Sequence, residues 1–282
     1  MTICILGAGE IGGAVAHALA RGERVARVVL MDEGGTIAAG KALDIQQAGA
    51  VEGFDTRVEG TSDLTRLTGC SVCVVADTGR PPTEWHGETA LAAMARLKGF
   101  VGEAPIVFAG TSQSELLLAS VREAGFHHRR LVGSAPEAFA SAARAIVALE
   151  ARCSSLEVAL SVLGAPGGFV IPWSEATVGG RSLERVLTQV EVRRVDARVA
   201  RLWPPGPHAL GLAAARIVEA LVTSARRAPS VFAVLAGEFG VRDCVGVLPC
   251  LLAPPGIIDV RLPALNARER VQIETMDHAV SA

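Results

Sequence analysis

The chain has 282 residues, of which 50% are hydrophobic, and it carries a net charge of −2 at pH 7 with a pI near 6.3. This apolar content is enough for one large core or two of moderate size. The balanced charge argues against a nucleic-acid partner, because such partners are bound through clustered cations.

The same composition argues against a membrane protein. No window reaches the roughly 18 uninterrupted apolar residues that a membrane span needs. Met1 leads directly into a strand-like run without the basic start of a signal peptide. We therefore expect a cytoplasmic protein whose six cysteines are free thiols. No metal-ligand spacing occurs in the sequence, so we expect no metal site.

The first half of the chain alternates between strand-like and helix-like segments. Strands are predicted at 2–6, 26–31, 56–59, 71–76, 105–109 and 130–133. Helices are predicted at 10–21, 38–50, 86–99 and 114–125. Because the strands are apolar, this alternation predicts an α/β arrangement, with a parallel sheet that helices cover on both faces.

The rhythm changes after about residue 134. Strand-like stretches are predicted at 155–164, 230–240 and 243–262. Helices are predicted at 182–202, at 210–225 and from about 264 to the end, and the first of them is rich in arginine. This half therefore mixes antiparallel strands with helices, which is typical of an α+β arrangement.

A glycine motif links the first strand to the first helix. Gly7, Gly9 and Gly12 form G-x-G-x-x-G within TICILGAGEIGGAVAHALARG. The first glycine permits a tight turn, the second lets the backbone approach a pyrophosphate, and the third lets the helix pack on the strand. The N–H groups at the start of the helix then face the phosphates. The alternative is a glycine-rich turn that binds nothing.

Asp32 strengthens the nucleotide interpretation, because it ends the second strand about 20 residues after the motif. A carboxylate there can accept hydrogen bonds from both ribose hydroxyls and would repel a 2′-phosphate. The sequence therefore favours NAD over NADP as cofactor.

Several longer stretches resemble the lactate/malate dehydrogenase family, especially its malate dehydrogenases. They are MDEGGTIAAGKALDIQQAGAVEGFDTRVEGTSDL, RLVGSA, ALGLAAARIVEALV and LAGEFGVRDCVGVLPCLLAPPGIIDVRL. The resemblance covers essentially the whole chain. It implies a Rossmann-type dinucleotide-binding domain over 1–134 and an α+β substrate domain over 135–282. It also implies an oxidoreductase that acts on a small-molecule ligand and assembles as a homo-oligomer, either a dimer or a tetramer.

The motif and the resemblance predict the cofactor-binding residues in the glycine loop and at the ends of the strands predicted at 26–31, 71–76 and 105–109. They are Gly7, Ala8, Gly9, Glu10, Ile11, Gly12, Asp32, Ala76, Asp77, Thr78, Gly79 and Ala109.

The catalytic positions of the family carry other residues here. In that family a His exchanges the hydroxyl proton, an Asp orients the His, and an Arg grips the substrate carboxylate. The resemblance puts Pro166 at the His position in LGAPGGFVIP, and Phe139 and Ala142 at the Asp and Arg positions in GSAPEAFASAAR. Arg144 lies two residues beyond Ala142, roughly 200° around a helix, and so faces elsewhere. Thr111 replaces an Asn.

Three further residues are candidates for a substrate pocket. ADTGRPPTEWHGETAL resembles a shortened form of the family's mobile loop, in which Arg80 matches an arginine and His86 falls near a second one. His208 precedes a helix that faces the substrate pocket in this family. Each has an ordinary alternative, as an exposed loop residue or a helix-capping residue.

Three hypotheses follow. The first is a non-catalytic NAD(H)-binding relative of these dehydrogenases. The second is an NAD-dependent oxidoreductase for a different, less charged hydroxy or keto substrate, because Phe139, Ala142 and Pro166 would make the pocket apolar. The third is a fold that binds nothing, which predicts residues obstructing the cleft below Gly9.

Overall fold

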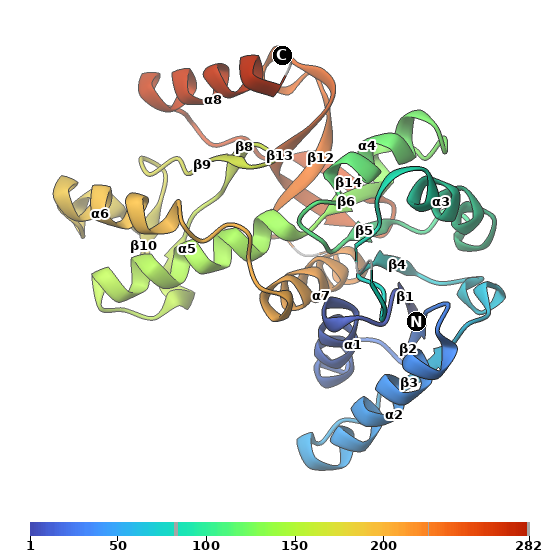
Figure 1. The fold of residues 1–282 in the computed structure, drawn as a ribbon. Helices are drawn as coiled ribbons and strands as arrows, with labels where there is room; N and C mark the ends of the chain where they lie inside the picture. The colour runs from blue at the N-terminus through green and yellow to red at the C-terminus, as the bar shows by residue number, and fades with distance from the viewer. Residues whose placement is uncertain (82–83, 225, 281–282) are drawn as a thin grey trace.

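The computed structural model describes residues 1–81, 84–224 and 226–280, and for residues 275–280 it describes the backbone. A long sheet runs through the molecule, with helices packed along it (Figure 1). The N-terminal half forms one end of this sheet, and α8 (Ala267–Val280) lies at the other end, near the C-terminus.

Six parallel strands form the N-terminal part of the sheet. In spatial order they are β3 (Arg57–Thr61), β2 (Arg27–Met31), β1 (Thr2–Leu6), β4 (Val72–Val75), β5 (Ile106–Phe108) and β6 (Leu131–Gly133). This 3-2-1-4-5-6 order is that of dinucleotide-binding sheets, in which a ligand binds at the carboxyl ends of the strands, where the order reverses. Here the reversal lies between β1 and β4. The predicted parallel sheet is confirmed.

The sheet continues into the C-terminal half through antiparallel pairs. β6 pairs with β12 at Gly133 and Phe232, and the path then runs to β13, β8 and β9, with β14 also paired to β13. These strands are β8 (Leu163–Ala165), β9 (Gly168–Val170), β12 (Ser230–Ala236), β13 (Arg242–Ala253) and β14 (Gly256–Val260). A small separate sheet holds β7 (Val158–Ala159), β10 (Thr177–Val178) and β11 (Arg181–Ser182).

The described residues contain seven further α-helices. They are α1 (Glu10–Gly22), α2 (Gly35–Glu52), α3 (Gly87–Val101), α4 (Ser114–Arg122), α5 (Ala135–Ala151), α6 (Gln189–Val199) and α7 (Pro207–Thr223). α1 and α7 lie side by side, because Gly211 of α7 leaves room for Ala14 of α1. Gly60 of β3 similarly lets the backbone of α2 approach at Ala38.

The strand predicted at 155–164 is wrong. Residues Ser155–Glu157 form a 3-10 turn, and the short strands β7 and β8 follow separately. The turn begins there because Ser154 and Glu157 form a reciprocal capping box. The apolar spacing of the stretch therefore reflects two short pieces that belong to different sheets.

The helix predicted at 182–202 is also shorter than expected. α6 begins at Gln189, because the Thr188 side chain and the Glu191 carboxylate cap each other's backbone N–H groups. Its arginines include Arg194 and Arg198, which both pair with Glu150 of α5 at the protein surface. Val190, in the first turn of this helix, is exposed.

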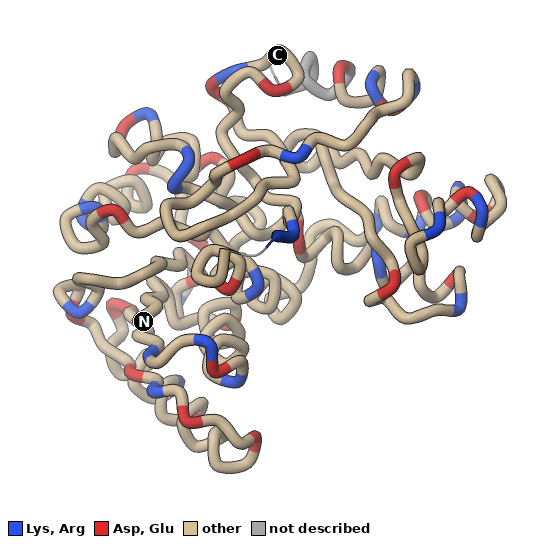
Figure 2. Tube along the Cα trace, turned by 180° about the vertical axis from the view of Figure 1, so that it is seen from behind, with Lys and Arg blue, Asp and Glu red and all other residues tan. Residues whose placement is uncertain are grey.

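Charges of both signs are interspersed along the trace (Figure 2). No described helix is both long and apolar enough to cross a membrane.

Candidate functional site

The glycine loop lies where β1 ends and α1 begins. Gly7 has φ +106°, a conformation that favours glycine, and its N–H donates to the Met31 carbonyl of β2 (2.7 Å). A side chain at Gly12 would collide with the Gly7 carbonyl oxygen. The loop therefore depends on its glycines, as the motif predicts, and it presents the start of α1 to the carboxyl ends of the strands.

Asp32 is buried and connects three loops. Its Oδ2 accepts hydrogen bonds from the N–H groups of Ala8 (3.0 Å) and Gly79 (2.9 Å), and its Oδ1 accepts from Gly34 N–H (2.9 Å). A carboxylate has about four acceptor sites, so roughly one remains. Asp32 therefore has room for one further donor in this arrangement, whereas the sequence suggested two ribose hydroxyls.

A cavity of about 640 Å³ lies beside Asp32. The β4–α3 connection contributes Arg80, Trp85 and His86 to its wall, and the segment after β2 contributes Asp32 and Glu33. Its volume is in the range of a small-molecule site. Arg80 and His86 thus line the same cavity as Asp32 and Thr78, two of the predicted cofactor residues. Two other residues of this connection, Pro82 and Thr83, lie outside the described residues.

Asp77 follows β4, and its carboxylate turns into the glycine loop. Its Oδ1 accepts a hydrogen bond from Gly12 N–H at 2.9 Å. A side chain at Gly9 would overlap the Asp77 carboxyl group. Because the second glycine of this motif is the one that a pyrophosphate approaches, a carboxylate occupies the anion-binding face of the loop.

The loop after β5 is held by a residue that sequence reasoning missed. The Gln113 side chain is buried, accepts from Gly110 N–H (2.8 Å) and donates to the Ala76 carbonyl (3.4 Å). It thereby connects the loops after β4 and β5, where Ala109 is buried and Thr111 is half-buried. No sequence signal marks this role, since a Gln at a helix start is common.

Aromatic rings surround Phe139, one of the positions that the resemblance assigns to catalysis. Its ring lies 4.8 Å from that of Phe169 of β9 and 6.2 Å from that of Trp203, measured between centroids. Phe169 and Trp203 are 4.6 Å apart, and Phe232 of β12 borders both. We call these four residues the aromatic cluster. They make the surroundings of Phe139 apolar, and a substrate pocket at this place stays a prediction.

Pro166 has a structural role at its position. Pro166 and Gly167 form the two-residue turn between β8 and β9, in which Ala165 pairs with Gly168. Gly167 has φ +80°, so the pair matches a turn with Pro at its first central position and Gly at its second. The residue therefore supports a tight hairpin and offers no group that can transfer a proton.

His208 is not placed with the other candidates. It is exposed in the first turn of α7 and lines a shallow groove with Glu10, His17 and Lys41 on the outer side of α1 and α2. His208 is therefore an exposed residue of α7, and the N-cap of this helix is Gly206, so the capping or packing role that is its alternative is not seen either.

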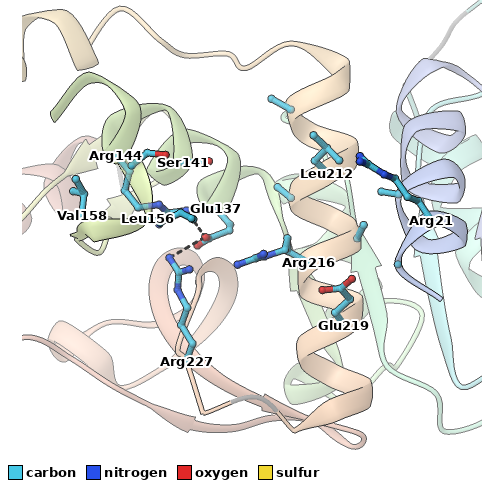
Figure 3. A pocket seen from close by; sticks show the side chains of 16 residues that line it. Arg21, Glu137, Ser141, Arg144, Leu156, Val158, Leu212, Arg216, Glu219 and Arg227 are labelled. Atoms are coloured by element: carbon cyan, nitrogen blue, oxygen red, sulfur yellow. Dashed lines mark hydrogen bonds and ion pairs between the residues drawn. The ribbon is translucent and has the colours of Figure 1, made fainter. Parts of the chain in front are cut away.

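Arg144 faces away from the aromatic cluster, as helix geometry predicts. It pairs with Glu137 on the same face of α5, with 2.7 Å between Arg144 Nη2 and Glu137 Oε1. Both are at least nine-tenths buried. The pair lies in a cavity of about 630 Å³ between α1, α5 and α7 (Figure 3). The seven-residue spacing in the sequence could have indicated this pair.

Further cations gather around Glu137. Arg227 Nη2 lies 3.6 Å from Glu137 Oε1, and Ser230 N–H donates to Glu137 Oε2 at 3.2 Å. Burial lowers the pKa of Arg227; the Glu137 carboxylate opposes this shift, and the positive charges of Arg144 and Arg216 add to it. Figure 3 shows the arginines of α5, α7 and the following loop directed toward the same space. Glu137 thus neutralises a cluster of cations that would otherwise repel one another.

No family model matches the chain. Among curated proteins, it is 27% identical over 293 residues to the malate dehydrogenase of Salinibacter ruber, covering 98% of this chain and 93% of that protein. It is 28% identical over 293 residues to the malate dehydrogenase of Thioalkalivibrio sulfidiphilus, covering 96% of this chain and 94% of that protein.

Solved structures give the same result for the fold. The malate dehydrogenase of Salinibacter ruber superposes with a TM-score of 0.87 at 24% identity, covering 100% of this chain and 95% of that one. A lactate dehydrogenase of Cryptosporidium parvum, solved with lactic acid and nicotinamide adenine dinucleotide, superposes with a TM-score of 0.89 at 22% identity, covering 99% and 95%.

We predict that Glu137→Ala lowers the free energy of unfolding by about 3 kcal/mol, because it leaves the buried Arg144 without its counterion. Chemical denaturation followed by circular dichroism measures this. Glu150→Ala is the matched control on the same helix, since its partners Arg194 and Arg198 are exposed, and a loss within about 1 kcal/mol is expected. Equal losses for the two variants would contradict the prediction.

Proposed function

Because the chain is homologous to malate and lactate dehydrogenases over nearly its full length, we propose that it is an NAD(H)-binding member of that oxidoreductase family without 2-hydroxy-acid dehydrogenase activity. One observation carries the proposal. The glycine loop and Asp32 form a hydrogen-bonded unit at the carboxyl ends of the parallel strands, where a dinucleotide would bind, while apolar rings surround Phe139.

The residues present fit the cofactor once the Asp77 side chain has rotated away from Gly9. The backbone N–H groups at the start of α1 would bind the pyrophosphate, since the loop already holds one anionic group, the Asp77 carboxylate. The remaining acceptor site of Asp32 would take a hydroxyl of the adenosine ribose. The 640 Å³ cavity beside Asp32 would receive the rest of the adenosine. When bound, NAD(H) supplies a hydride donor or acceptor.

The positions that the resemblance assigns to the family reaction carry Pro166, Phe139 and Ala142. A proline in a tight turn cannot act as acid or base, and Phe139 and Ala142 cannot orient a His or grip a carboxylate. General acid–base help alone contributes about 10²- to 10⁴-fold in rate. Its loss together with the carboxylate-binding Arg supports a protein that binds the cofactor without turning over malate or lactate.

The alternative is an NAD-dependent oxidoreductase for a less charged hydroxy or keto substrate, and the apolar surroundings of Phe139 favour it. It needs a proton-transfer group near the reacting carbon. The two histidine candidates lie elsewhere, because His86 lines the cavity beside Asp32 and His208 lies by α1 and α2. These positions support the non-catalytic proposal over this one.

The resemblance also implies a homo-oligomer, which we include in the proposal. Light scattering at the concentrations used for ligand titration gives the subunit number.

We predict that the protein binds NADH at least about tenfold more tightly than NADPH, because the Asp32 carboxylate repels a 2′-phosphate. Calorimetric titration with each cofactor measures this. Asp32→Asn keeps an acceptor for the Ala8 and Gly79 N–H groups but removes the charge, so the preference for NADH should fall. The variant Asp259→Asn, which makes the same charge change at an exposed residue of β14, is the control and should retain the preference. A preference that Asp32→Asn leaves unchanged would argue against this role of Asp32.

We further predict no turnover above the uncatalysed background with malate, oxaloacetate, lactate or pyruvate, since the acid–base and carboxylate-binding groups are replaced. NADH absorbance followed at high protein concentration checks this. Measurable oxidation of malate or lactate would overturn the non-catalytic proposal. Turnover of an uncharged alcohol or ketone alone would favour the alternative.

A further inference from the structure

The carboxylate of Asp77 lies in the position that an anionic ligand of the glycine loop would take. We propose that Asp77 is an internal competitor of the cofactor pyrophosphate, and that it sets the cofactor concentration at which the site fills. This inference rests on the proposed NAD(H) site and adds a control that the proposed function does not contain.

Asp77 and the pyrophosphate would compete for one N–H donor, that of Gly12, and for the face of the loop at Gly9. Asp77 Oδ1 takes the Gly12 N–H at 2.9 Å, which is one of the N–H groups that the first turn of α1 offers to an anion. The carboxyl group also covers Gly9 on the side where a side chain would stand. A pyrophosphate that approaches Gly9 therefore meets the carboxylate first.

Asp77 cannot leave the site by moving its backbone. Its carbonyl oxygen accepts from Gly9 N–H at 2.9 Å, and the preceding Ala76 N–H donates to the Leu6 carbonyl at 2.8 Å. These bonds join the residue to the glycine loop and to β1. The whole Asp77 residue is 7% exposed. Rotation about the side-chain bonds is therefore the motion that opens the loop to a ligand.

The charges make binding of an anionic ligand unfavourable even after the Asp77 side chain has rotated, because the carboxylate stays nearby. Carboxylate and pyrophosphate are both anions, and repulsion between like charges is strong where water is excluded. Lys41 donates to the Gly9 carbonyl oxygen at 2.9 Å and so already has a partner. The cofactor must consequently displace Asp77 from Gly12 and tolerate its charge, and this weakens binding compared with a neutral residue at this position.

The test compares Asp77→Asn and Asp77→Ala with the unchanged chain. Asn retains an oxygen acceptor for Gly12 N–H and removes the charge, whereas Ala removes both. We expect NADH to bind at least about tenfold more tightly to both variants in calorimetric titration. Asp259→Asn is the matched control, because it makes the same charge change at an exposed residue of β14, and its affinity should equal that of the unchanged chain.

Two smaller ligands show which part of NADH accounts for the gain in affinity of the Asp77 variants. ADP-ribose contains the pyrophosphate and should show the same gain in affinity, whereas adenosine lacks it and should show none. Thermal unfolding of each variant verifies that it is folded. If the unchanged chain binds NADH and both Asp77 variants bind it equally or more weakly, the inference is overturned while the proposed function stands. A gain that adenosine shares would also overturn it. Binding of NADH by none of the proteins would overturn the proposed function and this inference with it.

Discussion

The hydrogen bonds of one buried carboxylate hold the nucleotide end of this molecule together. Asp32 accepts N–H groups from the glycine loop, from the turn after β2 and from the loop after β4. Three segments that are far apart in the sequence thus share a single anion, which is stable in a buried place because the backbone donors satisfy it. The cavity beside it, the position of Gly79 and the approach to Gly9 all depend on this contact.

The glycine loop with Asp32 and the aromatic cluster are built on different principles. Backbone N–H donors and the Asp32 carboxylate make the first polar. The aromatic cluster consists of four rings, and pairs of rings contribute about 0.5–1.5 kcal/mol each beyond their burial. The rings of Phe139, Phe169 and Phe232 thus stabilise the contact between α5, β9 and β12.

The sequence predicts the parallel half well, because apolar strands, helical spacing and the glycine motif all indicate the same arrangement there. It predicts the Asp32 position for the same reason. It fails at 155–164 and 182–202, where the capping boxes of Ser154 and Thr188 override the apolar spacing. The sequence places Asp77 among the cofactor residues, but the direction of its side chain depends on tertiary contacts that the spacing of residues does not reveal. The Gln113 bridge and the placement of His208 by α1 are further cases.

The continuous sheet also limits how the protein can respond to a ligand. β6 and β12 join the two halves in one sheet, with Gly133 against Phe232, so a hinge between the halves would have to break strand pairing. A response to a ligand that keeps this pairing takes place in side chains and surface connections, such as the side chain of Asp77, and leaves the sheet as it is.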